Sequence, residues 1–375
     1  MDELRPEFVD FVRELVLEES PSTDPDAQRG MRALLTSALR DLGLDVEHIP
    51  GRRSGGHLVA RTPGAGAGPG ATGGAQLIVG HMDTVWPIGT LREMPVQVSG
   101  GRLTGPGVFD MKAGLAIGVF ALRALRDLGL DPGVAPIFFI NSDEEIGSPE
   151  SEPLIHELAR EASRAFVLEP ALGLSGQLKT RRKGIGQYHV EVEGRSSHAG
   201  LAPEEGASAI LELAHAIRQI DRLADPATGT TLNVGLIEGG SRPNVVAARA
   251  NCEVDVRLWT AAELERVREG MFGLRSTVPG TRITVTEVAS RGPMERTPRN
   301  VALWERALRV ADEIGIELQE GSSGGGSDGN LTSQHTATLD GLGAVGDGAH
   351  ALHEFVFVDR AIERVALLAG LLVAP

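Results

Sequence analysis

Short apolar runs that alternate with helical patterns are the feature that most constrains the fold of this chain. The segment 113–129 is apolar almost all round, which predicts a helix buried against a sheet. Because strands that alternate with helices form a sheet with helices on its faces, we expect an α/β protein. The expected strands are 46–49, 57–61, 76–80, 135–140 and 165–168.

Two helical patterns precede these strands, at residues 4–19 and 25–42. Asp24 is expected to cap the second helix, with Pro25 in its first turn. The Gly-, Ala- and Pro-rich stretch 63–75 is expected to be a flexible surface loop.

A different pattern begins near residue 184, where apolar Tyr188, Val190 and Val192 alternate with polar residues. This period of two predicts a strand with one wet face. Further strands are expected at 232–237, 252–259 and 281–288, with helices at 261–273 and around a stripe of Ile210, Leu213, Ala214 and Ile217. The order β-α-β-β-α-β is the split ferredoxin-like arrangement.

The α/β pattern resumes after residue 290 and ends in the apolar helix 359–373. We therefore expect residues 1–180 and 290–375 to form one domain, with 181–289 as a smaller inserted domain.

Charge and cysteine content exclude several classes of protein. The 375 residues carry a formal charge of −15, which argues against nucleic-acid and anionic-membrane partners. The single Cys252 excludes a thiolate metal cluster, so a transition metal would need His and carboxylate ligands. The chain has no run of 18 uncharged apolar residues and begins with an acidic amphipathic pattern, so we expect a cytoplasmic protein.

Successive α/β elements end in His or carboxylate residues. His81 and Asp83 follow the strand 76–80, and Asp110 stands just before the helix 113–129. Glu144 and Glu145 follow the strand 135–140, and Glu169 follows 165–168. Because the carboxyl ends of the strands in an α/β sheet line one crevice, these groups should converge. Such a set needs a compensating cation and suits zinc, cobalt or manganese.

Seven motifs in this order and spacing resemble the two-zinc exopeptidase family of glutamate carboxypeptidase, acetylornithine deacetylase and succinyl-diaminopimelate desuccinylase. They are GHMDTV, GVFDMKAG, NSDEEIGS, LEP, GRSSHAG, GGGSD and GAHALHEFV, and the resemblance spans residues 5–373. It is closest to the glutamate carboxypeptidase branch. It implies a mixed-sheet catalytic domain of zinc exopeptidase type and an inserted α+β ferredoxin-like domain that serves as lid and dimerisation domain.

The resemblance also implies a ligand set for two divalent metal ions, Zn²⁺ first and Co²⁺ or Mn²⁺ as alternatives. The implied ligands are His81 and Glu169 for one ion, Glu145 and His350 for the other, and Asp110 as the bridge. His353 is the alternative to His350, which is favoured because it stands four residues before Glu354.

Three catalytic roles follow from the same resemblance. Glu144 matches the general base that activates a metal-bridging water, and Asp83 matches the carboxylate that orients His81. His198 resembles a lid histidine that reaches the active site of the partner subunit, which implies a homodimer. The peptide bond Asp110–Met111 is expected to be cis. Asp143 has no assigned role.

Substrate contacts are expected from the inserted domain. Arg257 and Asn244 match positions that hold the free α-carboxylate of the substrate, and an Arg fork suits that anion. Arg182, Lys183 and Arg291 are further contacts for an acidic side chain. The segment GGGSD, residues 324–328, lacks the Lys of a phosphate loop and is expected to form a wall beside the metals.

The expected function is a metal-dependent hydrolase, a metallocarboxypeptidase that cleaves the amide bond before a C-terminal amino acid of a peptide or N-acyl amino acid. An N-acyl-amino-acid deacylase of the acetylornithine deacetylase type uses the same chemistry and is the first alternative. A two-metal phosphoesterase is a remote alternative, which the negative net charge of the chain disfavours. A non-catalytic relative is disfavoured because every ligand position and Glu144 are retained.

Overall fold

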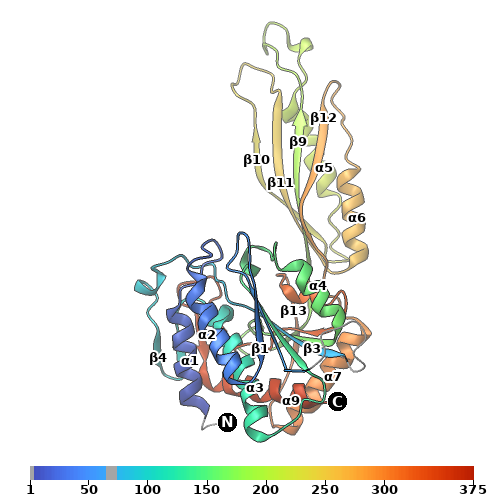
Figure 1. Ribbon diagram of the computed structural model, residues 1–375. Helices are drawn as coiled ribbons and strands as arrows, with labels where there is room; N and C mark the ends of the chain where they lie inside the picture. Colours follow the sequence, from blue (N-terminus) through green and yellow to red (C-terminus); the bar gives the residue numbers. More distant parts are fainter. Residues whose placement is uncertain (1–3, 65–73) are drawn as a thin grey trace. The chain divides into compact units, whose positions relative to one another are not determined.

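The computed structural model describes residues 4–64 and 74–375 and divides into two compact units, each described here by itself (Figure 1). The first unit comprises Met1–Thr180, Arg296–Ser323 and Ser327–Pro375, and the second comprises Arg181–Glu295 with Gly324–Gly326. Residues 65–73 of the expected surface loop lie outside the described residues.

A six-stranded mixed sheet forms the centre of the first unit. Its order is β1 (Asp45–Ile49), β2 (His57–Arg61), β6 (Pro136–Asn141), β3 (Ala75–His81), β7 (Ala162–Val167) and β14 (Ala337–Leu339). The neighbours from β6 to β14 are parallel, whereas β1 pairs antiparallel with β2 and β2 with β6. The prediction of an α/β protein with a mixed sheet is therefore confirmed.

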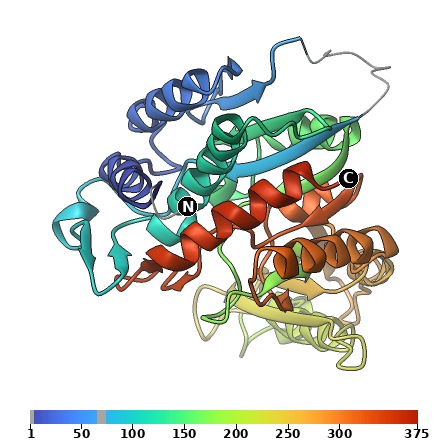
Figure 2. The same ribbon diagram turned by 90° about the horizontal axis from the view of Figure 1, so that it is seen from below.

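Helices cover both faces of this sheet. One face packs Ile78, Phe138 and Phe166 in a core shared with α1 (Arg5–Leu17), α2 (Gln28–Asp41), α3 (Ala113–Leu128), α7 (Pro298–Glu313) and α9 (Val358–Val373). The other face packs Leu77, Val79 and Phe139 with α4 (Glu152–Glu161) and α8 (Asp328–Thr332). Figure 2 shows α9 lying along α3, with which it is in contact. Burial on both faces explains the continuous apolar runs of the central strands.

Gly114 lets the first turn of α3 approach the end of β7. A Cβ at this position would lie 2.2 Å from the backbone oxygen of Leu168, so only glycine fits. Asp110, just before α3, and Glu169, just after Leu168, are thereby brought towards each other.

Smaller sheets complete the first unit. One has the order β15 (Gly346–Asp347), β16 (Phe355–Phe357), β5 (Arg102–Thr104) and β4 (Gln97–Ser99). In the other, β13 (Glu320–Ser323) pairs with β8 (Leu178–Arg182), whose last two residues belong to the second unit. The pairing of β16 with β5 brings the segment around 354 against the segment that precedes Asp110.

The second unit has the β-α-β-β-α-β order that the sequence predicts. Its elements are β9 (Gly184–Glu193), α5 (Ala209–Asp221), β10 (Thr231–Gly239), β11 (Arg249–Leu258), α6 (Ala261–Phe272) and β12 (Arg282–Arg291). The sheet has the order β10-β11-β9-β12, in which every neighbouring pair is antiparallel. Tyr188, Val190 and Val192 pack in its core, as their alternation predicts, and β10 and β12 are its edges.

Two local predictions are wrong. The helix α2 begins at Gln28, and the Asp24 carboxylate accepts the N–H groups of Asp26 and Ala27 in the turn before it. The buried face of α5 also differs from the expected stripe, since Ile210 and Ala214 are exposed. The residues buried along α5 are Ala209, Glu212, Leu213, Ala216 and Ile220.

None of the helices among residues 4–64 and 74–375 combines the length and the hydropathy that a membrane crossing needs.

Candidate metal centre

Three adjacent strands of the first unit deliver His and carboxylate groups at their carboxyl ends. His81 ends β3, Glu145 lies in the one-turn helix Glu144–Ile146 after β6, and Glu169 follows β7. Since β6, β3 and β7 are parallel neighbours, these groups meet at one edge of the sheet. Asp110 comes from the short turn Val108–Lys112 that leads into α3.

Asp110 faces two imidazoles with its two different oxygens. Its Oδ1 lies 3.2 Å from Nε2 of His81, and its Oδ2 lies 3.6 Å from Nε2 of His350. Glu169 Oε1 is 3.7 Å from His81 Nε2, and Glu145 Oε2 is 3.1 Å from His350 Nε2. The ligand atoms therefore form two groups of three, each within 4.8 Å, that share Asp110.

These residues fit a pair of divalent cations. Burial by itself lowers the pKa of His81, but its hydrogen bonds with Asp110 and Asp83 raise that pKa well above the ordinary value. The hydrogen bond with Glu145 raises the pKa of His350 to about 9. The field of the carboxylates thus favours positive charge at both imidazoles. The buried Oε1 of Glu145 has no hydrogen-bond partner among the described residues, and carboxylate and imidazole donors suit zinc and its neighbours.

Asp83 contacts His81 and also holds the turn that follows β6. The Nδ1 atom of His81 lies 2.9 Å from the backbone oxygen of Asp83 and 3.5 Å from its carboxylate. That carboxylate accepts the N–H groups of Glu144, at 3.3 Å, and Glu145, at 3.2 Å, and the hydroxyl of Ser22, at 2.6 Å. Asp83 therefore fixes the turn that carries two predicted site residues.

Asp143, for which the sequence offers no role, stabilises the same turn through hydrogen bonds to residues that follow it. Its buried carboxylate accepts the N–H groups of Glu150, at 2.7 Å, and Ser151, at 3.2 Å. The three consecutive acids at 143–145 therefore differ in function, since the first one anchors the turn that places the other two.

Glu354 is a buried residue whose part in the site the sequence did not predict. Its carboxylate accepts N–H groups from Gly107, Phe109 and Asp110, at 2.8 to 3.0 Å, and from the indole of Trp86, at 3.0 Å. Burial raises the pKa of Glu354 to about 7, while these four donors favour the ionised form. The segment that presents Asp110 thus depends on this carboxylate. The peptide bond Asp110–Met111 within it is cis, as expected.

Among the two C-terminal imidazoles, His350 lies in the second group and the exposed His353 does not. The backbone of His350 has a φ of 60°, which is rare for a residue other than glycine and persists where the surroundings enforce it. His353 instead lines a hollow of about 300 Å³ together with Arg102, Leu352 and Phe355.

His198 and Asn244 are neighbours in the second unit. The N–H of Ala199 donates to the backbone oxygen of Asn244, at 3.0 Å, and both His198 and Asn244 are exposed. Nδ1 of His198 accepts the N–H groups of Gly200 and Leu201, at 3.1 and 3.2 Å. In the neutral ring the proton therefore sits on Nε2, which presents an outward donor.

The predicted substrate cations of the second unit have partners within it. The Arg257 guanidinium donates twice to Asp255, at 2.9 and 3.1 Å. Arg182 is buried and donates to the backbone oxygens of Gly325 and Gly326, which holds the glycine-rich segment. Lys183 donates to the Gly229 oxygen. Arg291 ends β12.

The residue that ends the glycine-rich motif has a structural role in the first unit. Asp328 is buried, and its carboxylate accepts hydrogen bonds from Asn141, at 2.6 Å, and Ser148, at 2.5 Å. It therefore links α8 to the turn that follows β6.

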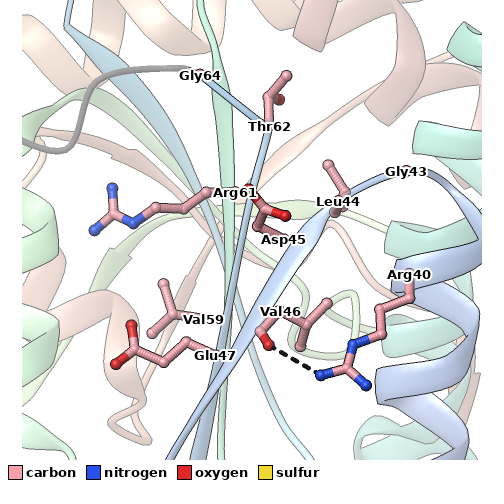
Figure 3. Close-up of a pocket in the computed structure, with 10 residues that line it drawn as sticks. All are labelled: Arg40, Gly43, Leu44, Asp45, Val46, Glu47, Val59, Arg61, Thr62 and Gly64. Atoms are coloured by element: carbon pink, nitrogen blue, oxygen red, sulfur yellow. Dashed lines mark hydrogen bonds between the residues drawn. The ribbon is translucent and has the colours of Figure 1, made fainter.

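A larger hollow, of about 640 Å³, lies beside β1 and β2 and contains none of the predicted site residues (Figure 3). Arg40, Asp45, Glu47 and Arg61 line it, and Arg40 donates to the backbone oxygen of Val46. This hollow is thus separate from the predicted site residues.

Comparison with known proteins gives one family and one fold. Residues 77–374 match the sequence profile of Peptidase family M20/M25/M40. The chain is 27% identical over 376 residues to carboxypeptidase G2 of Pseudomonas sp. (strain RS-16), covering 98% of this chain and 89% of that protein.

Two solved structures share the fold along the whole chain. The aminopeptidase PepT from Bacillus cereus superposes with a TM-score of 0.77 at 22% identity, covering 100% of this chain and 98% of that one. The YXEP protein of Bacillus subtilis, described as a dinuclear metal-binding peptidase, superposes with a TM-score of 0.70 at 14% identity, covering 100% and 98%.

Replacing the two C-terminal imidazoles one at a time tests the ligand set. His350→Ala should lose about one bound divalent ion per chain, because it removes a donor from one of the two groups. His353→Ala, three positions along the same segment, is the matched control and should keep both ions. Metal content after dialysis measures the difference, and loss of an ion from His353→Ala alone would reverse the assignment.

Glu354→Gln should weaken metal binding by roughly 10- to 100-fold, because an amide cannot accept all four N–H groups and turns its own donor towards them. Competition with a chromophoric chelator measures the affinity. Glu93→Gln changes a carboxylate beside the same hollow that Glu354 lines and should leave the affinity unchanged. An unchanged affinity in Glu354→Gln would show that the 107–110 segment holds its shape without this carboxylate.

Proposed function

The chain belongs to Peptidase family M20/M25/M40, and from that premise we propose that it is a zinc-dependent carboxypeptidase that removes a C-terminal amino acid from a short peptide or an N-acyl amino acid. Membership makes the chain an enzyme that acts on peptide bonds. The observation that carries the finer proposal is the pair of candidate ligand groups that share Asp110, one of which contains Glu145, the sequence neighbour of Glu144. The similarity to carboxypeptidase G2 supports the carboxypeptidase activity over the deacylase activity.

We assign the ligands as the sequence predicts. His81 and Glu169 would hold one ion, Glu145 and His350 the other, and Asp110 would contribute one oxygen to each. Bound divalent ions supply Lewis acidity, which polarises the scissile carbonyl and lowers the pKa of water.

Glu144 is assigned as the general base. Asp83 holds its backbone N–H, and Glu144 precedes the assigned ligand Glu145 in the same one-turn helix, which supports this assignment. It takes a proton from the attacking water and returns a proton to the leaving amine, so that the carboxylate is regenerated. His198, with Nε2–H directed outward, suits donation to the developing oxyanion.

Arg257 and Asn244 are assigned to the substrate α-carboxylate. The guanidinium of Arg257 makes two hydrogen bonds with Asp255, which fix its plane, and its remaining N–H groups are available to an anion. Acidic or N-acyl-glutamate substrates are therefore the first to test.

Glu144→Gln should lower kcat by about 10² to 10⁴-fold and retain both metal ions, because the amide keeps the shape of the side chain and cannot accept a proton. The assay is release of the C-terminal amino acid, with metal content measured in parallel. Glu47→Gln, an exposed carboxylate on β1, is the control and should keep full activity.

A panel of dipeptides, N-acyl amino acids and phosphate esters, assayed by mass spectrometry with and without chelator, separates the competing activities. We expect chelator-sensitive release of C-terminal glutamate. Preferential release of acetate or succinate from N-acyl amino acids would assign the deacylase instead. Phosphate release would assign the phosphoesterase instead. Turnover by Glu144→Ala at the wild-type rate would overturn the assignment of the base.

We also propose a homodimer through the second unit. The edge strand β10 exposes Leu236 and Ile237, which are 61% and 62% accessible, and α5 exposes Ile210 and Leu211. An unpaired apolar edge is a ready surface for pairing with a second copy of the same strand. In such a dimer His198 would serve the metal centre of the partner subunit. The cytoplasmic location remains a prediction of the sequence.

Leu236→Asp should convert the dimer to a monomer and abolish most of the activity, because the charge would be buried against the partner strand. Light scattering after size exclusion measures the mass. Val288→Asp, at an exposed position on the opposite edge strand β12, is the matched control and should stay dimeric.

Mixing two inactive variants tests the role of His198 in the partner site. His198→Ala and Glu144→Gln, refolded together, should recover about one quarter of wild-type activity, since half of the dimers are mixed and each mixed dimer has one complete site. No recovery, with mixed dimers demonstrated, would place His198 outside the partner site.

A further inference from the structure

Two imidazoles meet outside the metal centre, where α4 faces the segment that follows α8. Nδ1 of His156 lies 2.8 Å from Nε2 of His335, and the two rings stand at 89° with their centroids 4.9 Å apart. The side chain of His156 is 19% exposed, so solvent reaches the pair. Neither residue takes part in the proposed reaction.

The neighbours of the pair define its protonation. Glu152 Oε1 lies 3.4 Å from Nε2 of His156, so the carboxylate favours a proton on that nitrogen and leaves Nδ1 as an acceptor. His335 therefore donates its Nε2–H to Nδ1 of His156. A single proton therefore lies between Nδ1 of His156 and Nε2 of His335. If that proton leaves, both nitrogens have a free lone pair.

Charged groups on the packed elements keep His335 neutral. Burial, Arg160 on α4, His156 and Arg299 on α7 all lower the pKa of His335. Arg299 also donates to the backbone oxygens of Ser333 and His335, which fixes the segment that carries the ring. A neutral imidazole is the form that coordinates a metal.

We propose that His156 and His335 form an additional metal site that takes one late first-row transition ion in place of the shared proton. The ion binds Nδ1 of His156 and Nε2 of His335. The proton displaced from Nε2 of His335 leaves to solvent, and Nδ1 of that ring, which has no hydrogen-bond partner among the described residues, takes up a proton from solvent.

A metal bound by both nitrogens would set the distance between them. With metal–nitrogen bonds of about 2.0–2.1 Å, two cis ligands at a right angle lie about 2.9 Å apart and two tetrahedral ligands about 3.3 Å apart. The present distance of 2.8 Å is that of a hydrogen bond, so the two nitrogens already lie near the separation that cis ligands of Cu²⁺ or Ni²⁺ would need. The Nε2–H of His335 now points at the lone pair of His156 Nδ1, so binding requires both rings to turn, and the partial exposure of both side chains permits that rotation.

The carboxylate on the far nitrogen of His156 is a second feature of metal-binding histidines, because it fixes the tautomer and raises the basicity of the ligand. Arg160 and Arg299 oppose a dication, so we expect micromolar binding, weaker than at the five-ligand centre. An ion at this position would join α4 to the segment after α8, and the start of α8 is itself tied through Asp328 to the 141–148 turn that precedes α4.

The test is a titration of the zinc-loaded enzyme with Cu²⁺ or Ni²⁺ alone. The wild type should take up one ion beyond the zinc, with two-nitrogen hyperfine structure in the Cu²⁺ electron paramagnetic resonance spectrum. His156→Ala and His335→Ala should each lose that ion and keep the zinc. Glu152→Gln should weaken its binding by roughly 10-fold.

His215→Ala removes an exposed histidine from α5 and is the control, expected to bind as the wild type does. His335→Gln, which keeps a polar side chain, guards against misfolding and should also lose the extra ion. Equal uptake by the wild type and His335→Gln, or no uptake by the wild type, would overturn the proposal and leave the pair as a hydrogen bond.

Discussion

The crowding of three carboxylates at one edge of the sheet is the constraint on which the first unit depends. Asp110, Glu145 and Glu169 are held within a few ångströms of two imidazoles, and burial makes their mutual repulsion stronger than it would be in water. The arrangement persists in part because other parts of the fold hold the backbone of two of these residues. Asp83 binds the N–H of Glu145, and Glu354 binds the N–H of Asp110. Two additional buried carboxylates thus position the ligands without belonging to either group.

Strands and turns contribute differently to this arrangement of carboxylates. Parallel neighbours β6, β3 and β7 fix where the chain reaches the edge, and the turns after them aim the side chains. Asp143 shows how local this aiming is, since it binds N–H groups only seven and eight residues ahead and so closes the turn on which Glu144 and Glu145 stand. Rigid strands set the coarse positions and short hydrogen-bonded turns set the fine ones.

Sequence reasoning succeeds where a pattern has one physical cause. Apolar runs mark strands buried on both faces, and the carboxyl ends of parallel strands must converge, so the grouping of His81, Glu145 and Glu169 follows without a structure. It fails where a hydrogen-bond partner is distant in the sequence, or where several apolar residues of one helix could each form its buried face. Nothing near Glu354 in the sequence indicates N–H donors some 245 residues away. The face of α5 was misjudged because Ile210 is apolar and yet exposed, and the small Ala209 and Ala216 are buried instead.

The bond between Glu354 and the 107–110 segment also has a consequence for the order of assembly. Asp110 belongs to both candidate ligand groups. The carboxylate that stabilises its turn, Glu354, lies 244 positions further along the chain, and the second unit lies between the two in the sequence. During synthesis from the ribosome, the N-terminal strands can pair and bury their apolar faces well before residue 354 emerges. The turn that carries Asp110 can take its final shape only after the C-terminal segment docks, so under the proposed ligand assignment the capture of ions would be a late event in the maturation of this chain.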